Sequence, residues 1–231
     1  MIDHDRIPAV LTIRACDDRP ISPAPPPIEP GPSPEAGSFR AVFLDRDGTL
    51  IADRPYSADP DRIELLDGVI EGLALLDRAG YRLIVVTNQS GIARGYFDEA
   101  ALARMHQRID ELLKPAEVSV RAFYYCPHHV EGIDPALARP CWCRKPGPGM
   151  LLRAAADWSI ELPSSWLIGD RLTDCQAGER AGCRSVLLGT RPASARYPVA
   201  SDLIEAARRV IASDGHARSA AGGARRESPR R

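Results

Sequence analysis

Residues 43–50 read Phe43-Leu44-Asp45-Arg46-Asp47-Gly48-Thr49-Leu50, so two carboxylates follow an apolar run and precede a glycine. This pattern indicates a buried strand that ends in a turn at Gly48, where Asp45 and Asp47 can converge on one pocket. There one carboxylate can attack phosphorus while the other transfers protons. Taken alone, the eight residues favour an ordinary strand end with an aspartate-glycine turn. The catalytic interpretation therefore requires a phosphate-binding group, a cation and a third carboxylate elsewhere in the chain.

The composition argues against several classes of protein. Lys and Arg number 30 against 31 Asp and Glu in 231 residues, so no overall basic field draws the chain to nucleic acid or anionic membrane. The longest apolar runs, such as Leu83 to Val86, are far shorter than the roughly 20 residues that span a bilayer. The N-terminus, with Asp3 and Asp5, does not resemble a secretion signal. We expect a cytoplasmic monomer that acts on a small molecule, without a nucleic-acid or membrane partner.

The chain divides into three segments. Residues 1–38 hold eight prolines between Pro20 and Pro34, which predicts an extended, poorly packed and disordered arm. Residues 213–231 combine five arginines with small residues and have almost nothing to bury, so a disordered tail is expected. A nucleic-acid role for these arginines is a weaker alternative. Residues 39–212 are long enough for one folded domain.

Short β-rich runs alternate with helical patterns between the tails, which predicts an α/β fold. We expect a Rossmann-like three-layer sandwich with a central parallel sheet and no large cap domain. The predicted strands are Arg40 to Asp45, Tyr81 to Thr87, Val120 to Cys126, Ser165 to Gly169 and Arg184 to Leu188, and the predicted helices span about 68–79, 98–113, 148–157, 173–181 and 201–212. Ligands bind beyond the carboxyl ends of such strands. Asp45, Thr87, Cys126 and Asp170 all fall there.

Two later segments offer groups for phosphate. Thr87-Asn88-Gln89-Ser90-Gly91 directly follows an apolar run, and its hydroxyls, amides and backbone N–H groups can bind an anion. A polar turn explains this loop about equally well. Arg144 and Lys145 precede a helix start, and Lys145 is placed to neutralise a phosphoryl group, although adjacent cations are usually a solvated surface feature.

The run Gly169-Asp170-Arg171-Leu172-Thr173-Asp174 adds two carboxylates at the same sheet edge. Asp170 is the better candidate for a magnesium ligand. Asp174 could equally cap or orient the next helix, because acidic residues favour the first helical turn. The third carboxylate that the opening motif requires is thus available.

A second constellation is Cys126-Pro127-His128-His129, followed by Cys141-Trp142-Cys143. Structural zinc prefers a closed tetrahedral set of Cys and His, whereas disulfides are disfavoured in a reducing cytosol. We predict that Cys126, His128, Cys141 and Cys143 bind one zinc ion, with His129 as a neighbour. Unrelated buried thiols explain the other three cysteines but not four ligands so close together. With four protein ligands, the zinc has a structural role and staples a long loop.

Together, the four polar segments resemble the motif series of haloacid dehalogenase superfamily phosphatases: Asp-x-Asp-Gly-Thr, Thr-Asn, Lys and Gly-Asp-x-x-x-Asp. The resemblance implies that Asp45 is a nucleophile that forms an aspartyl-phosphate, and that Asp47 is the general acid and then the general base. It also implies Mg²⁺ held by Asp45, the Asp47 carbonyl and Asp170. The phosphoryl oxygens would be stabilised by Thr87, Asn88 and Lys145.

Further motifs narrow the resemblance to the subgroup of heptose bisphosphate phosphatases and histidinol-phosphatases, over residues 41–191. These motifs are Asp45-Arg-Asp-Gly, Leu66-Asp-Gly-Val, Val86-Thr-Asn-Gln-Ser-Gly-Ile-Ala-Arg-Gly, Tyr124-Tyr-Cys-Pro-His-His and Cys143-Arg-Lys-Pro. The resemblance implies hydrolysis of the C7 phosphate of D-glycero-D-manno-heptose 1,7-bisphosphate, in the biosynthesis of nucleotide-activated heptose. The long loop from His128 to Cys141 favours the heptose substrate over histidinol phosphate, the main alternative.

A bisphosphate substrate needs a second anion contact, and Arg144 beside Lys145 could reach the C1 phosphate. The loop from Gln89 to Arg94, with Ser90, and the segment around Asp53 and Tyr56 are candidate sugar contacts. A noncatalytic, zinc-stapled binding module that keeps the fold is the alternative from another class. The intact catalytic carboxylates and lysine argue against it.

Overall fold

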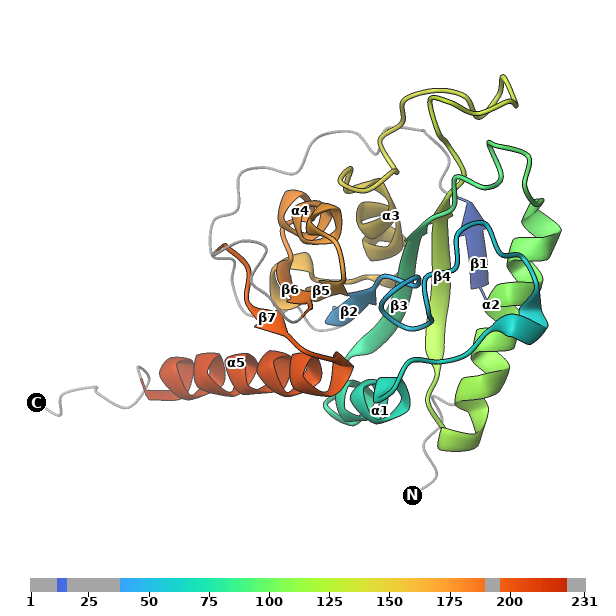
Figure 1. Ribbon diagram of the computed structural model, residues 1–231. Coiled ribbons are helices and arrows are strands. Elements are labelled where there is room, and N and C mark those ends of the chain that lie inside the picture. Colours follow the sequence, from blue (N-terminus) through green and yellow to red (C-terminus); the bar gives the residue numbers. More distant parts are fainter. Residues whose placement is uncertain (1–11, 16–37, 190–195, 224–231) are drawn as a thin grey trace, which may run out of the picture.

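The computed structural model describes residues 12–15, 38–189 and 196–223 (Figure 1). These residues form a seven-stranded sheet in the order β1-β4-β3-β2-β5-β6-β7, in which every neighbouring pair is parallel. The strands are β1 Thr12–Ala15, β2 Ala41–Leu44, β3 Arg82–Asn88, β4 Val120–Cys126, β5 Trp166–Gly169, β6 Arg184–Leu188 and β7 Val199–Ala200. The α-helices are α1 Val69–Arg78, α2 Glu99–Leu113, α3 Gly149–Trp158, α4 Leu172–Ala181 and α5 Leu203–Gly223, with 3₁₀ helices at Pro60–Arg62, Lys114–Ala116 and Leu162–Ser164.

Both faces of the sheet are buried, which explains why the central strands are apolar at nearly every position. Successive side chains of a strand point to opposite faces. In β2, Val42 and Leu44 therefore join one hydrophobic core, whereas Ala41 and Phe43 join the other. The apolar run that precedes Asp45 is thus a central strand of the sheet.

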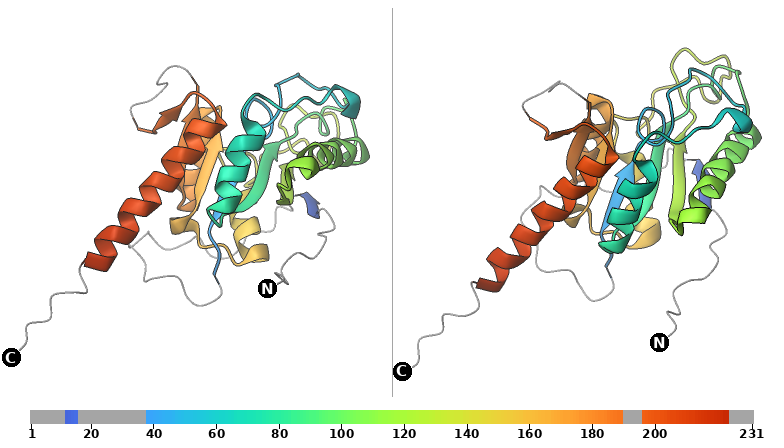
Figure 2. Two further views of the ribbon diagram at one scale, coloured as in Figure 1. Left: turned by 90° about the horizontal axis from the view of Figure 1, so that it is seen from below. Right: turned by 60° about the horizontal axis from the view of Figure 1, so that its bottom comes forward.

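The helices lie in two layers, one on each face. The core around Val42 and Leu44 is covered by α1, α2 and α5, and the core around Phe43 by α3 and α4. Figure 2 shows α1 and α5 side by side on the first of these faces. Between β2 and α1, and between β3 and α2, the described residues form loops and a short 3₁₀ helix rather than a cap domain. The predicted three-layer α/β fold without a large cap is confirmed.

The sheet is wider than predicted. All five predicted strands are present, with ends that differ by at most one residue, but β1 and β7 were not expected. The prediction of an arm without a folded element is wrong for Thr12–Ala15, which pairs along β4 from Ala122 to Tyr125. The rest of that arm lies outside the described residues. Strand pairing uses backbone groups, so a short edge strand needs no apolar pattern of its own. None of the described helices is long and apolar enough to cross a membrane.

The last helix extends beyond its predicted end at residue 212, and Asp214, near its middle, is anchored to residues of the sheet and its flanks. Asp214, assigned to the tail by composition, accepts hydrogen bonds from Tyr81, from Arg184 and from Arg40 Nη1 at 3.0 Å. Burial raises the pKa of Asp214, but the hydrogen bonds from Tyr81 and Arg184 outweigh this effect and lower it. The expected tail beyond Gly223 lies outside the described residues.

We predict that Asp214→Ala lowers the free energy of unfolding by about 1–3 kcal/mol at neutral pH, because three buried or half-buried donors lose their acceptor. Urea unfolding would measure this loss. The matched control is Glu71→Ala, which removes an exposed pair with Arg208 at 3.7 Å and should cost less than about 0.5 kcal/mol.

The loss at Asp214 should depend on pH in a defined direction. A carboxyl whose pKa is lowered by folding stabilises the protein above its unfolded pKa, and this contribution disappears as the pH falls through the folded value. The stabilities of Asp214→Ala and the unmodified protein should therefore converge under acid conditions. Equal stabilities at neutral pH would contradict the anchoring role.

Candidate active site

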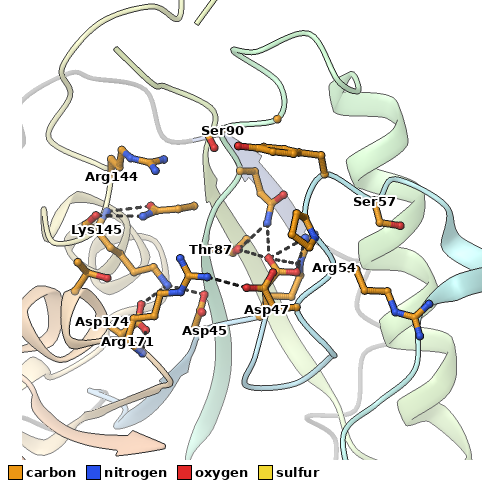
Figure 3. A pocket seen from close by; sticks show the side chains of 18 of the residues that line it. Asp45, Asp47, Arg54, Ser57, Thr87, Ser90, Arg144, Lys145, Arg171 and Asp174 are labelled. Atoms are coloured by element: carbon orange, nitrogen blue, oxygen red, sulfur yellow. Dashed lines mark hydrogen bonds and ion pairs between the residues drawn. The ribbon is translucent and has the colours of Figure 1, made fainter. Parts of the chain in front are cut away.

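The carboxyl ends of β2, β3 and β5 meet at one edge of the sheet beside a cavity of about 520 Å³ (Figure 3). Because β2 lies between β3 and β5, the segments that follow these strands come together although they are distant in sequence. The cavity is lined by the predicted residues Asp45, Asp47, Asp53, Tyr56, Thr87, Asn88, Gln89, Ser90, Arg144 and Lys145. Its size is in the range of small-molecule sites.

Lys145 is buried between two carboxylates. Its Nζ lies 2.6 Å from Asp45 Oδ1 and 2.7 Å from Asp174 Oδ1, and it donates to the Val86 carbonyl at 2.9 Å. Burial lowers the pKa of Lys145, but Asp45 and Asp174 outweigh this effect and raise it, so the ammonium stays protonated. Burial raises the pKa of Asp45, and Lys145 opposes that shift only in part. Full ionisation of Asp45 near neutral pH therefore calls for further positive charge.

A third carboxylate completes this cluster. Asp45, Asp170 and Asp174 each present an oxygen within 4.8 Å of the others. Three carboxyl groups thus gather around the ammonium of Lys145, and the partly exposed Arg171 Nε lies 3.9 Å from Asp170 Oδ2. Within the described residues, the buried Asp170 Oδ1 has no hydrogen-bond partner. Because hard oxygen donors suit Mg²⁺ and a divalent ion would favour ionisation of these carboxyl groups, the residues present fit such an ion.

The glycine of the opening motif makes room for this cluster. Gly48 has a φ of +78°, and a Cβ at this position would lie 2.5 Å from Asp170 Oδ2. Any other residue would meet both backbone strain and a collision with the carboxylate. The turn expected at Gly48 therefore also leaves the space that Asp170 occupies.

The Asp47 carboxylate lies beside Thr87 and is held from two sides (Figure 3). Arg46 Nη2 lies 2.9 Å from both carboxylate oxygens, and Gln89 Nε2 donates to Oδ2 at 2.8 Å. Gln89 Nε2 also lies 2.8 Å from Thr87 Oγ1. The Asp47 carboxylate is not part of the acidic cluster, so only its backbone carbonyl remains a candidate metal ligand.

The remaining predicted phosphate-binding residues differ in their placement. Asn88 uses both polar groups of its side chain on the main chain of Lys145: Nδ2 donates to the carbonyl at 3.1 Å and Oδ1 accepts from N–H at 3.0 Å. Its contacts position Lys145. Ser90 and Arg144 line the cavity. Arg94 does not line it and pairs instead with Glu131 at 2.7 Å.

The four predicted zinc ligands come together next to this edge. The three sulfur atoms of Cys126, Cys141 and Cys143 lie 3.2–3.5 Å apart, and His128 Nδ1 lies 3.4 Å from Cys143 Sγ and 3.7 Å from Cys126 Sγ. Zinc–sulfur bonds of about 2.3 Å in a tetrahedron give sulfur–sulfur edges of about 3.8 Å. The donor set and its spacing therefore fit a closed zinc site.

Several lining residues were not singled out from the sequence. Arg54, Ser57 and Arg171 line the cavity, and Arg171 bonds Asp53 at 2.7 Å. Single polar residues in loops carry no spacing signal, so the sequence offered no way to find them. Asp174 was weighed in the sequence as a second carboxylate at this edge or as a cap for the next helix, with Asp170 preferred as the metal ligand. It does accept from the Arg171 N–H at 2.9 Å, and the same side chain pairs with Lys145.

Comparison with known proteins decides the family. A family model described as HAD-hydrolase-like matches residues 142–206. The D-glycero-beta-D-manno-heptose-1,7-bisphosphate 7-phosphatase of Photorhabdus laumondii is 42% identical over 166 residues, which cover 71% of this chain and 88% of that protein. The chain belongs to the HAD-like phosphatase family. The enzyme of the same name from Escherichia coli K12 is 43% identical over 153 residues, 66% of this chain and 80% of that protein.

A solved HAD-like phosphatase structure agrees with the fold. The D,D-heptose 1,7-bisphosphate phosphatase of B. bronchiseptica, complexed with magnesium and phosphate, superposes with a TM-score of 0.65 and 31% identity. The match covers 76% of this chain and 99% of that one. Nearly the whole of that enzyme therefore has a counterpart here.

We predict that Gly48→Ala raises the Mg²⁺ concentration for half-maximal phosphatase activity at least about tenfold, because the new Cβ displaces Asp170. Gly80→Ala is the matched control, since Gly80 has a similar φ of +82° but its Cβ would meet nothing closer than 4.0 Å. Both variants should lose about 1–2 kcal/mol of stability because alanine disfavours a positive φ, and Gly48→Ala should lose more because of the collision with Asp170. An unchanged Mg²⁺ requirement in Gly48→Ala would contradict the placement of Asp170.

We also predict about one zinc ion per chain by metal analysis. Cys126→Ser should lose that zinc and unfold at a lower temperature, because a closed site contributes directly to folding. Cys183→Ser, which changes a buried thiol outside the cluster, should keep the metal. A zinc content that is the same in both variants would show that these four residues do not form the site.

Proposed function

We propose that the protein is a Mg²⁺-dependent phosphatase that removes the C7 phosphate of D-glycero-D-manno-heptose 1,7-bisphosphate and leaves the C1 phosphate in place. The observation that carries the proposal is the buried cluster of Asp45, Lys145 and Asp174 beside the cavity, in a chain whose relatives at 42–43% identity are named for this reaction. The product would enter the synthesis of nucleotide-activated heptose. These relatives favour the heptose substrate over histidinol phosphate and over a noncatalytic binding module.

In the first step, an Asp45 carboxylate oxygen would attack the C7 phosphorus, and the bond between phosphorus and the C7 oxygen would break. Lys145 Nζ, 2.6 Å from Asp45, is close enough to stabilise the phosphoryl oxygens as charge moves onto them. A primary alkoxide leaves poorly without a proton, which Asp47 would donate. The products of this step are heptose 1-phosphate and an aspartyl-phosphate on Asp45.

In the second step, Asp47 is ionised and would accept a proton from water. The water oxygen would attack the phosphorus, the bond to Asp45 would break, and inorganic phosphate would leave. Arg46 and Gln89 hold the Asp47 carboxylate beside Thr87 throughout, so one residue can serve both proton transfers.

Mg²⁺, when bound, would offset the repulsion between the nucleophilic carboxylate and the phosphate dianion. Asp45, Asp170 and the Asp47 carbonyl would hold it, and the position of Asp174 lets that residue adjust the charge of the same cluster. The Asn88 side chain would fix the main chain of Lys145 and so place the Lys145 ammonium. Asn88 itself would make no direct contact with phosphate.

The second phosphate of the substrate would bind to arginine. Arg144 is the candidate given by its place beside Lys145, and Arg54 and Arg171 line the same cavity. Guanidinium groups bind phosphate through two parallel hydrogen bonds. A substrate with phosphates at both ends suits a cavity with Lys145 at its floor and arginines around it.

The zinc would be structural, because Cys126, His128, Cys141 and Cys143 leave no open coordination position for water. Cys143 directly precedes Arg144, so the stapled loop would carry Arg144 and Lys145 to the cavity. An open cavity without a large cap agrees with a small soluble substrate. We further infer a cytoplasmic monomer whose folded unit includes β1 and the whole of α5.

The test is turnover of three candidate substrates by the purified protein with Mg²⁺: both anomers of the heptose bisphosphate and histidinol phosphate. We expect phosphate release from a heptose bisphosphate at a kcat/KM at least about a hundredfold above that for histidinol phosphate, because the second phosphate adds a charged contact. Asp45→Asn should abolish turnover and keep the zinc. Absence of Mg²⁺-dependent turnover of all three would refute the proposed function.

A further inference from the structure

A buried histidine lies behind the catalytic turn, in a part of the molecule that the proposed mechanism does not use. His106 lies in α2, is fully buried, and its ring stacks on Phe123 of β4 with centroids 4.5 Å apart. Its Nε2 lies 3.4 Å from Nη1 of Arg46, the residue between the two catalytic aspartates. The helix layer is thus connected to the catalytic turn through a polar contact.

Arg46 connects this histidine to Asp47. A guanidinium only donates hydrogen bonds, so His106 Nε2 must accept and the ring must be neutral. The opposite edge of the same guanidinium contacts Asp47, with Nη2 at 2.9 Å and Nε at 3.2 Å from both carboxylate oxygens. Arg46 itself is almost entirely buried. Its planar group is therefore fixed at one end by His106 and holds Asp47 at the other.

The surroundings of the ring agree with a fixed acceptor rather than a proton carrier. Burial and the charge of Arg46 lower the pKa of His106 well below its usual value, which keeps the ring neutral. In the described part of the chain, His106 Nδ1 has no hydrogen-bond partner, so no polar group meets the ring on the side away from Arg46. The polar contact of the ring is directed at Arg46.

We propose that His106 is a positioning residue that fixes the Arg46 guanidinium and through it aims the Asp47 carboxylate at the leaving-group oxygen and then at the attacking water. The inference rests on the proposed function, because it needs Asp47 as the acid and base. Without the acceptor at His106, Nη1 of Arg46 would be a buried donor that has lost its partner, and only the contacts with Asp47 would still fix the orientation of the guanidinium. A displacement of the Asp47 carboxylate by about 1 Å can lower the reaction rate about a hundredfold.

The test compares two variants with different properties at this contact. His106→Phe keeps an aromatic ring to stack on Phe123 but removes the acceptor, whereas His106→Gln supplies an acceptor oxygen without the ring. We expect His106→Phe to lower kcat for the heptose bisphosphate about 10- to 100-fold with KM changed less than about twofold. His106→Gln should recover most of that loss. Ile109→Val, a buried change one turn along α2, serves as the control for stability alone.

A second readout separates positioning from general damage. Nitrophenolate leaves without a proton, so the first turnover of 4-nitrophenyl phosphate does not need the acid form of Asp47. In His106→Phe the rate of that first turnover should stay within about twofold, with a burst of one nitrophenolate per site, while the first turnover of the sugar bisphosphate slows. If His106→Phe does not fold, Arg46→Lys, which keeps the charge but loses the two-pronged contact, should give the same selective loss.

Three outcomes would overturn the inference: equal loss of both first-turnover rates, a change in KM alone, or equal losses in His106→Phe and His106→Gln. Failure of the proposed function itself would be recognised separately. In that case the unmodified protein would hydrolyse neither substrate, or Asp47→Asn would keep full activity on the sugar bisphosphate.

Discussion

The buried ammonium of Lys145, 2.6 Å from Asp45 and 2.7 Å from Asp174, is the interaction on which the catalytic edge depends. Burying these charges costs desolvation free energy, and the attraction between them offsets that cost only when the charged atoms are kept in close, well-oriented contact. With Asp170 added, the cluster carries more negative than positive charge. The cluster therefore contributes little to stability, and its excess of carboxylates suits a divalent cation and then a phosphate.

The fold supplies the support that this cluster needs. Asn88 fixes the main chain of Lys145, Gly48 leaves room for Asp170, and the Arg171 N–H holds Asp174 at the start of α4. Asn88 is the last residue of β3, and Gly48 and Arg171 follow the carboxyl ends of β2 and β5. Lys145 itself follows the zinc-ligand loop after β4. Parallel strands in the order β3-β2-β5 bring these ends together. The site is thus a product of sheet topology, with short loops carrying the specific contacts.

The sequence predicted the elements whose signals are local. Apolar strands, helical spacing and the cysteine–histidine pairs were found because burial and ligand chemistry select residue types at fixed spacing. It did not predict β1, whose pairing depends on backbone groups, or the anchoring of α5 by Asp214, which depends on Tyr81, Arg40 and Arg184 from distant strands and their flanks. Asn88 and Gln89 were placed at the right edge, but the contacts they make there depend on tertiary geometry.

The most direct test of the account is to trap the covalent intermediate. The enzyme with Mg²⁺ and heptose bisphosphate would be quenched in acid within the first turnover, digested and analysed by mass spectrometry. The account predicts a peptide that contains Asp45 and carries one phosphoryl group, which disappears on treatment with hydroxylamine and is absent from Asp45→Asn. A phosphoryl group on another residue, or rapid phosphate release with no labelled peptide at any quench time, would contradict the assignment of Asp45 as the nucleophile.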